Sequence, residues 1–189
     1  MNIILLGAPG AGKGTQGEYL CGKYELTHIS SGDLIRAEIA AKTPVGLRVQ
    51  ECVKKGNLVS DETVVEIVAG KLEMLNGGWL LDGFPRTLPQ AEELGRYLES
   101  RGTKIDFIIL LNVTEEVVVK RLAGRGREDD DAATVKKRLM VFQDLTHPLV
   151  GYYKGQGTFK EFDGAPAATE VSDALAQFID GSRNGNGHV

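Results

Sequence analysis

Short apolar runs recur along the chain and are separated by segments with helical periodicity. The runs cover residues 3–6, 79–81 and 107–111, and their apolar residues are consecutive rather than alternating with polar ones. Strands that are covered on both faces of a parallel sheet have this pattern, because neither of their faces meets water. We therefore expect all three runs to be strands of a parallel sheet.

The helical pattern is clearest in residues 61–75, which follow Ser60, the expected N-cap. One face of this segment carries four apolar residues: Val64, Val68, Leu72 and Leu75. A second helix should begin at Thr114 and a third near Asp131. The expected buried side of the third helix carries Val135, Leu139, Phe142, Leu145 and Leu149. Because strands and helices alternate along the chain, the predicted fold class is α/β.

Three segments depart from this alternation. Residues 30–59 contain two short helical patterns and are too long for a plain connection, so we expect a small inserted subdomain. Residues 124–131 are rich in glycine and charge, which suggests a mobile loop between two helices. Residues 181–189 are polar and glycine-rich, and we expect a disordered tail there. The expected core of the single domain 1–180 is then formed by residues 1–29, 60–123 and 132–180.

The composition narrows the class of protein. The 189 residues suit one domain, and 42% hydrophobic and 25% charged residues are ordinary for a soluble globular protein. The net charge of −4 argues against nucleic acid or an anionic membrane as the main partner. Cys21 and Cys52 lack the spacing of a zinc or redox site, and no apolar run approaches the ~20 residues that span a bilayer. Since the N-terminus has no leader-like region either, a cytoplasmic protein is expected.

A glycine-rich loop follows the first apolar run. Gly7 to Lys13 fits the pattern Gly-x-x-x-x-Gly-Lys-[Ser/Thr], except that Gly14 occupies the hydroxyl position and Thr15 comes one residue late. Between a strand and a helix, such a loop wraps phosphate with backbone N–H groups. The sequence therefore predicts a phosphate site, and it leaves direct binding of magnesium by a side-chain hydroxyl in doubt.

Cations are frequent outside this loop. Taken singly, each arginine has a plain interpretation as a surface residue in a solvated ion pair. Together with Lys13, six arginines make more cations than the phosphates of one nucleotide need. They are Arg36, Arg86, Arg121, Arg125, Arg127 and Arg138. Two phosphate chains placed end to end would need them, because arginine and lysine charge stabilises a phosphoryl group in transfer. Asp82 stands at the end of the apolar run 79–81, directly after Leu81, and its carboxylate could contact magnesium. An aspartate that only forms a turn before Gly83 would give the same sequence.

Four motifs appear in one order along the chain: Gly7-Ala-Pro-Gly-Ala-Gly-Lys-Gly-Thr15, Ser30-Ser-Gly-Asp-Leu-Ile-Arg36, Leu81-Asp-Gly-Phe-Pro-Arg86 followed by Gln90, and Gly124-Arg-Gly-Arg-Glu-Asp-Asp130. With them, the chain resembles the adenylate kinase family from residue 1 to about 180. The resemblance implies a P-loop nucleotide kinase fold, in which helices flank a five-stranded parallel sheet. It further implies a monophosphate-binding insertion at 30–59 and a short lid at 124–131. The implied reaction is the reversible transfer of the terminal phosphoryl group of ATP to AMP, giving two ADP, in adenine nucleotide homeostasis.

The resemblance also implies roles for individual residues. The expected ATP-binding residues are Gly10, Ala11, Gly12, Lys13, Gly14, Thr15, Arg121, Arg125 and Gly164. The expected AMP-binding residues are Ser31, Arg36, Asn57, Leu58, Val59, Gly83, Phe84, Pro85, Arg86, Gln90, Arg127 and Arg138. The expected catalytic cations are Lys13, Arg86, Arg121, Arg125, Arg127 and Arg138, and Asp82 would reach Mg²⁺ through water. The implied partners are ATP, AMP and ADP, bound by a monomer without nucleic acid or membrane.

Two departures refine the resemblance. Threonine is more frequent in the family where Ser31 stands, but the hydroxyl is kept. The lid is short and contains no cysteine, which resembles the short-lid subgroup, so no zinc site is expected.

Other functions remain open at this point. The nearest is a kinase for UMP, CMP or another monophosphate, although Gln90 favours adenine because an amide can pair with both the amino group and a ring nitrogen of a purine edge. A GTPase-like switch would need an Asn-Lys-x-Asp stretch, which the sequence lacks. A non-catalytic nucleotide-binding module is the third alternative. Such a module would not need a charged residue at every position that phosphoryl transfer requires, yet this sequence has one at each.

Overall fold

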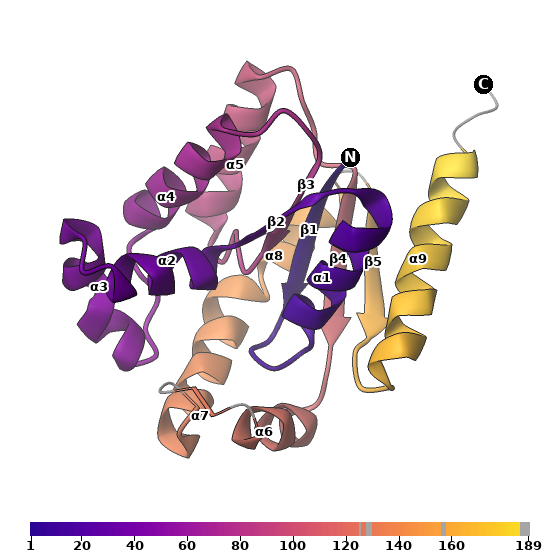
Figure 1. The fold of residues 1–189 in the computed structure, drawn as a ribbon. Helices are drawn as coiled ribbons and strands as arrows, with labels where there is room; N and C mark the ends of the chain where they lie inside the picture. Colours follow the sequence, from indigo (N-terminus) through magenta and orange to yellow (C-terminus); the bar gives the residue numbers. More distant parts are fainter. Residues whose placement is uncertain (125, 128–129, 156–157, 186–189) are drawn as a thin grey trace.

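Five parallel strands form one sheet in the computed structural model, which describes residues 1–124, 126–127, 130–155 and 158–185. The strands are β1 (Asn2–Gly7), β2 (Thr27–Ser30), β3 (Trp79–Asp82), β4 (Phe107–Asn112) and β5 (Thr158–Asp163), in the spatial order β2-β3-β1-β4-β5. The α/β class and the three strands expected from the apolar runs are confirmed. Helices lie on both sides of the sheet (Figure 1).

Each face of the sheet is covered by its own set of helices. On β1, Ile4 and Leu6 pack in the cluster that contains residues of α4 (Asp61–Glu73), α5 (Leu88–Ser100) and α8 (Leu149–Tyr153). Ile3 and Leu5 point the other way, toward α1 (Lys13–Tyr24) and α9 (Ala168–Gly185). Because both faces are buried, the strand residues are apolar without alternation, which is the pattern seen in the sequence.

The expected insertion contains two helices, α2 (Ser31–Ala40) and α3 (Pro44–Lys54), which lie beyond the β2 edge of the sheet (Figure 1). Thr43 caps α3, and its hydroxyl accepts a hydrogen bond from the N–H of Gly46 at 3.0 Å. A Cβ atom at Gly46 would lie 2.1 Å from the carbonyl oxygen of Glu38, so the close packing of α3 on α2 requires glycine here. The two short helical patterns expected in residues 30–59 are thus confirmed.

The helices after β4 are α6 (Glu115–Ala123), α7 (Ala132–Val141) and a π-helical turn, η1 (Phe142–Thr146). Asp131 caps α7 by accepting hydrogen bonds from two backbone N–H groups. The expectation that Leu145 faces the core is wrong, because Leu145 is 46% exposed while Thr146 is 7% exposed. The chain is π-helical over Phe142–Thr146, so the α-helical spacing from which Leu145 was expected to face inward does not apply there.

The chain beyond Gly181 also differs from expectation. Helix α9 continues to Gly185, whereas residues 181–189 were expected to be disordered, and residues 186–189 lie outside the described part. This helix end is held against α1, since Lys23 pairs with Asp180 at 3.3 Å and the guanidinium of Arg183 lies 6.0 Å from the ring centre of Tyr24. Ser60 stands at the start of α4 as expected, but its hydroxyl contacts Thr63 Oγ1 at 3.0 Å rather than a backbone N–H.

Candidate active site

The predicted site residues follow the carboxyl ends of neighbouring strands. In the sheet register, Asp82 at the end of β3 lies opposite Leu5 of β1 and Ser30 of β2. The glycine-rich loop leaves β1 at the same edge, and Gly164 follows β5 there. In parallel α/β sheets this edge is where ligands bind, at the strand where the chain reverses its winding direction.

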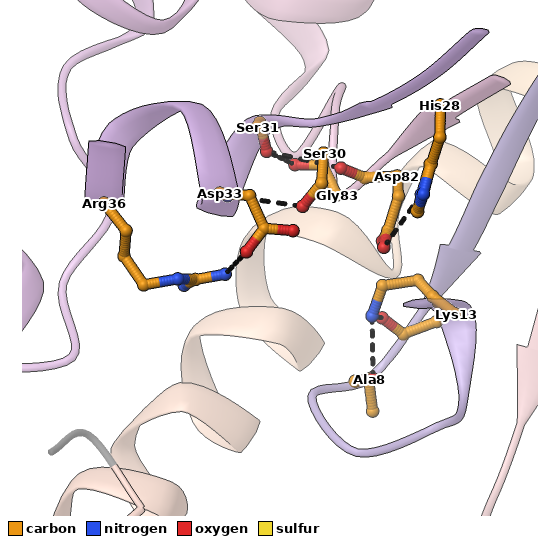
Figure 2. A network of polar contacts seen from close by, with 10 residues as sticks. Ala8, Lys13, His28, Ser30, Ser31, Asp33, Arg36, Asp82 and Gly83 are labelled. Atoms are coloured by element: carbon orange, nitrogen blue, oxygen red, sulfur yellow. Dashed lines mark hydrogen bonds and ion pairs between the residues drawn. The ribbon is translucent and has the colours of Figure 1, made fainter. Parts of the chain in front are cut away.

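The loop between β1 and α1 has the backbone form that its glycines predict. Gly10 and Gly12 adopt positive φ values of 78° and 98°, which side chains disfavour, and α1 begins at Lys13. The first N–H groups of a helix have no partner inside it, and the helix dipole adds positive potential there. The ammonium of Lys13 lies over the loop, donating to the carbonyl oxygens of Gly7 at 2.8 Å and Ala8 at 3.0 Å (Figure 2). This end of α1 is therefore suited to an anion.

Asp82 lies beside this helix end and faces His28 (Figure 2). The Nε2 of His28 is 3.7 Å from Oδ2 of Asp82, an ion pair longer than a hydrogen bond. Burial by itself would raise the pKa of Asp82, but His28 and the charge of Lys13 outweigh it, so the pKa is lowered. The same contact raises the pKa of His28 against the effect of burial. Asp82 is thus held as a carboxylate, the form that a cation needs.

Gly14 leaves space next to this carboxylate. A Cβ atom at residue 14 would lie 3.9 Å from Oδ2 of Asp82, so the glycine lies directly beside this largely buried carboxylate. A single carboxylate beside a phosphate site matches Mg²⁺, which is held by one or two carboxylates, phosphate oxygens and water. Asp82 therefore fits the magnesium role expected from the sequence.

A cleft with about 1010 Å³ of open space begins at Lys13 and extends toward the insertion. It brings together eleven of the predicted site residues: Lys13, Ser31, Arg36, Asn57, Leu58, Val59, Gly83, Pro85, Arg86, Gln90 and Arg138. Phe84 lies outside it, since its side chain is 2% exposed and packs in the core with α4 and α5. Only the backbone of Phe84 is available for a ligand.

The loop after β3 is held by the polar residues around it. Ser31 donates a hydrogen bond of 2.6 Å to the carbonyl oxygen of Gly83, and Arg86 Nε donates to the same oxygen at 2.7 Å. Arg36 on α2 forms an ion pair with Asp33 (Figure 2). Burial would raise the pKa of Asp33, but the hydrogen bonds from Arg36 and Ser30 and the charge of Arg127 lower it overall. Arg36 is therefore paired with a carboxylate, and Arg86 is hydrogen-bonded to a carbonyl oxygen.

Gln90, at the first turn of α5, is 1% exposed and fixed at both ends of its amide. Its Oε1 accepts a hydrogen bond from the backbone N–H of Arg86 at 2.7 Å. Its Nε2 donates to Oδ1 of Asp61 at 2.7 Å. The amide therefore lines the cleft in one defined orientation.

Two residues that contact the predicted site residues were missed in the sequence. Thr146 lines the cleft and donates a hydrogen bond of 2.9 Å to the carbonyl oxygen of Arg86. Asp61, the first residue of α4, was not among the predicted site residues, although its carboxylate contacts Gln90. Both contacts join residues far apart in the chain. The Asp61 contact has one local clue, an acid placed two residues after the expected backbone site 57–59.

Two expected ATP-side residues, Arg121 and Gly164, form a second group outside the cleft. Arg121 Nη2 donates to the carbonyl oxygens of Gly164 at 2.8 Å and Ala165 at 3.1 Å. Its Nη1 lies 3.5 Å from the carbonyl oxygen of Gly10 and 3.4 Å from that of Ala11. Arg121 thus connects the glycine-rich loop with the loop that follows β5.

The expected lid is described in part. Arg125 and residues 128–129 lie outside the described residues. Arg127 is exposed, and its backbone N–H donates to Oδ2 of Asp130 at 3.0 Å. The other carboxylate oxygen of Asp130 pairs with Arg138 at 3.6 Å. Asp130 therefore links the lid to the cleft residue Arg138.

Two features are absent from the part of the chain that the structure describes. Among residues 1–124, 126–127, 130–155 and 158–185, no group of three or more His, Cys, Asp or Glu side chains could hold a metal ion. Within the same ranges, no helix has the length and apolar character to cross a membrane. Cys21 and Cys52 are both free thiols, and burial raises the pKa of Cys21 to about 11.

Comparison with known proteins gives one consistent result. The family model described as "Adenylate kinase" matches residues 5–158. The adenylate kinase of Prochlorococcus marinus strain MIT 9313 is 48% identical over 177 residues, which are 94% of this chain and 97% of that protein. That of Xanthomonas campestris pv. campestris strain 8004 is 41% identical over 185 residues, covering 95% of this chain and 99% of that protein. The similarity therefore spans both the cleft and the Arg121 group.

Proposed function

This chain belongs to the adenylate kinase family, and we propose that it performs the family's reaction with the residues of the cleft and the Arg121 group. The reaction is the reversible transfer of the terminal phosphoryl group of ATP to AMP, which gives two ADP. ATP, AMP and ADP are accordingly its substrates. The proposal concerns the residues that carry the reaction and their roles.

One observation carries the proposal: a single cleft joins the N-terminus of α1 to a set of cations and an adenine-compatible amide. Lys13 stands at one end of the cleft, and Arg36, Arg86 and Arg138 line the rest. Direct transfer between two nucleotides requires their phosphates to meet in line, with positive charge around the group in flight. A site for one nucleotide and a water molecule would leave the second set of arginines without a task.

On the donor side, the ATP phosphates would lie on the backbone N–H groups of the loop and of the first turn of α1, Gly10 to Thr15. Lys13 would follow the transferring phosphoryl group, because its ammonium already lies over the loop. Arg121 would lie on the ATP side as one of the cations near the phosphates, and the backbone at Gly164 would border the adenine of ATP. Their hydrogen bond of 2.8 Å keeps this part of the site connected to the phosphate loop.

On the acceptor side, AMP would occupy the cleft. Its phosphate would meet Arg36 and Arg86, exchanging their present contacts with Asp33 and Gly83 for charge-assisted bonds to phosphate. Its base would lie near Ser31, Gln90 and the backbone of residues 57–59. Arg127 and Arg138 would reach the phosphates between the two nucleotides.

Magnesium accompanies ATP in this family, and Asp82 is the residue that would hold it here, through water. The ion supplies charge neutralisation between phosphate oxygens. The protein's contribution is a carboxylate kept ionised by His28 and Lys13 beside an open Gly14.

The short lid would keep water out of the site. Transfer to water would waste ATP, so the site must exclude it before chemistry. Arg125 and Arg127 are each next to Gly126, which has a positive φ of 73° and lets the backbone turn. We propose that both arginines move onto the phosphates when both nucleotides are bound.

A coupled assay with AMP, UMP, CMP and GMP as acceptors tests the assignment of the cleft. We expect AMP to give the highest kcat/KM, and equal or better use of UMP or CMP would reject the adenine assignment. A second test uses an analogue that joins two adenosines through five phosphates. Tight one-to-one binding supports two adjoining sites, whereas binding no tighter than that of ATP contradicts them.

The expectation of a monomer in the cytoplasm, with no zinc, stands beside this proposal. It rests on the free thiols, the modest net charge of −4 and the short lid without cysteine. Light scattering across a range of concentrations would test the monomer, and elemental analysis of the purified protein would test the absence of zinc.

A further inference from the structure

We infer that Asp61 is a positioning residue that fixes the amide of Gln90 and thereby makes the cleft select a 6-aminopurine monophosphate over a 6-oxopurine monophosphate. The inference rests on the proposed function of the cleft as the AMP site. It adds a residue outside the expected binding set, together with the chemical feature of the base that this residue controls.

Asp61 joins two helices that border the cleft. It is the first residue of α4, and Thr87 and Gln90 belong to the N-terminal end of α5. One oxygen of Asp61, Oδ1, accepts hydrogen bonds from Thr87 Oγ1 at 2.8 Å and from Gln90 Nε2 at 2.7 Å. The hydroxyl of Thr87 in turn accepts from the backbone N–H of Gln90 at 3.3 Å. Both ends of Gln90, its backbone and its side chain, are thus tied to the same carboxylate.

These contacts leave the amide only one orientation. The backbone N–H of Arg86 is a donor, so the amide atom 2.7 Å from it must be the oxygen. An ionised carboxylate only accepts, so the amide atom facing Asp61 must be the nitrogen. Turning the amide over would place its NH₂ against the Arg86 N–H and its oxygen against the carboxylate. Two favourable contacts would become two repulsive ones, in a side chain that is 1% exposed.

The fixed amide has one unused donor and one unused acceptor for a ligand in the cleft. An amide nitrogen has two hydrogens and its oxygen has two lone pairs, and the protein uses one of each. The edge of adenine offers an amino donor at C6 and an acceptor at N1, which match an oxygen and an N–H group. The edge of a 6-oxopurine is reversed, with an acceptor at C6 and an N–H donor at N1. Such a base would match Gln90 only after the amide had turned over.

The selectivity therefore depends on Asp61 as well as on Gln90. Without the carboxylate, the orientation rests on the Arg86 N–H alone, and the amide can turn to suit either edge. A site that hydrogen-bonds one pattern can reject the other by large factors, because the mismatch leaves buried polar groups unpaired. Loss of Asp61 should therefore change the choice between bases more than it changes the use of ATP.

The experiment compares kcat/KM for AMP and for inosine monophosphate in Asp61→Ala, Asp61→Asn and Glu62→Ala. We expect Asp61→Ala to reduce the AMP-to-inosine monophosphate ratio at least about tenfold with KM for ATP unchanged. Asp61→Asn should largely keep the ratio, because its carbonyl oxygen can accept both hydrogen bonds. Glu62→Ala is the matched control, since Glu62 is an exposed acid in the same helical turn. A wild-type ratio in Asp61→Ala would overturn the inference.

Gln90→Ala and the double variant Asp61→Ala/Gln90→Ala identify the route of the effect. We expect the double variant to have the same ratio as Gln90→Ala, because Asp61 acts through the amide. A further change of the ratio in the double variant would overturn the inference. If Gln90→Ala impairs use of AMP while Asp61→Ala keeps the wild-type ratio, the inference fails and the cleft remains the AMP site. If Gln90→Ala leaves AMP kinetics unchanged, the assignment of the AMP site fails as well.

Asp61→Ser provides the same test if Asp61→Ala does not fold. Serine is favourable near a helix N-terminus. Its side chain is one bond shorter than that of aspartate, so its oxygen cannot keep both contacts. Thermal unfolding followed by circular dichroism shows whether each variant is folded. We expect Asp61→Ser to lower the ratio as Asp61→Ala does, and an unchanged ratio in a folded Asp61→Ser protein would overturn the inference.

Discussion

The hydroxyl of Thr146 donates a hydrogen bond of 2.9 Å to the carbonyl oxygen of Arg86, so the π-helical turn η1 supports the loop that follows β3. Within η1, Thr146 faces inward and Leu145 is exposed. A partly buried carbonyl oxygen is stabilised by a donor, and the hydroxyl supplies one next to the arginine proposed to bind AMP. The unusual turn thus has a consequence for the site.

We expect Thr146→Val to raise KM for AMP several-fold while KM for ATP stays the same. Valine has the shape of threonine but leaves the Arg86 carbonyl oxygen without this donor, which costs roughly 1–3 kcal/mol in the free energy of unfolding. Steady-state kinetics and urea unfolding measure the two effects. Gln143→Ala, an exposed position of the same turn, is the control and should change neither. Equal kinetics in Thr146→Val and wild type would show that the contact does not support the site.

Lys13→Ala should abolish most phosphoryl transfer while the protein stays folded. A single cation at the transferring phosphate can contribute roughly 10³–10⁵ in rate. The control is Lys23→Ala in the last turn of the same helix, where the ammonium pairs with Asp180 at the surface. Turnover numbers and circular dichroism are the measurements. Activity within tenfold of wild type would remove Lys13 from the mechanism.

A feature of this protein could be predicted from the sequence when the residues that form it lie close together in the chain. The phosphate loop was predictable because its glycines, Lys13 and the start of α1 lie within one short segment. Strands β1, β3 and β4 were predictable because burial on both faces leaves unbroken apolar runs, whereas β2 and β5 have no such run. The orientation of Leu145 was not, because the apolar spacing has the same form in an α-helix and in a chain with one π-helical turn.

The contacts that support the site were harder still to predict from the sequence. Asp61 and Gln90 are 29 positions apart, and their hydrogen bond depends on how α4 and α5 are placed on the sheet. Arg121 was expected to bind ATP, but its contacts with the carbonyl oxygens of Gly164 and Ala165 follow from the tertiary fold. Sequence motifs therefore indicated the residues that line the cleft and the glycine-rich loop better than the residues that orient them.

Arg127→Ala should lower turnover by about 100-fold or more, because it removes charge proposed to stabilise the transferring group. The free energy of unfolding should change by no more than about 0.5 kcal/mol, since the side chain is exposed. Its backbone hydrogen bond to Asp130 is kept in the variant. Arg101→Ala, which removes a surface arginine that lies over the ring of Tyr97, should leave turnover unchanged. Turnover like that of wild type in Arg127→Ala would refute the proposed role.

The His28–Asp82 pair predicts a pH dependence of stability. Because Asp82 raises the pKa of His28 in the folded protein, the protonated imidazole stabilises the fold below its ordinary value of 6.5, and this contribution is lost as the pH rises through the raised pKa. Unfolding by urea in metal-free buffer should show the difference between wild type and His28→Gln shrinking across that range. Asp82 behaves in the opposite sense, losing its contribution as the pH falls below its ordinary value of 3.8. A pH-independent difference between the two proteins would contradict the ion pair.

Gly164→Ala should weaken ATP binding more than AMP binding. A Cβ atom at this position would lie 3.0 Å from both the carbonyl oxygen of Ala11 and Cγ1 of Val113, so the loop must shift away from the phosphate loop. The shift would also disturb the hydrogen bond of 2.8 Å between Arg121 and the Gly164 carbonyl oxygen. We therefore expect a several-fold increase in KM for ATP, measured at saturating AMP.

Gly151→Ala is the matched control for this prediction, because a Cβ atom there meets nothing within 4 Å. It lies in helix α8, where alanine is favoured over glycine by about 1 kcal/mol, so the variant should be at least as stable as wild type with unchanged KM for ATP. If Gly164→Ala raised KM for AMP and ATP equally, the loop after β5 would act on the whole fold rather than on the donor side. An unchanged KM for ATP would separate Gly164 from the nucleotide site, because the crowded contact with Ala11 would then be absorbed without moving the phosphate loop.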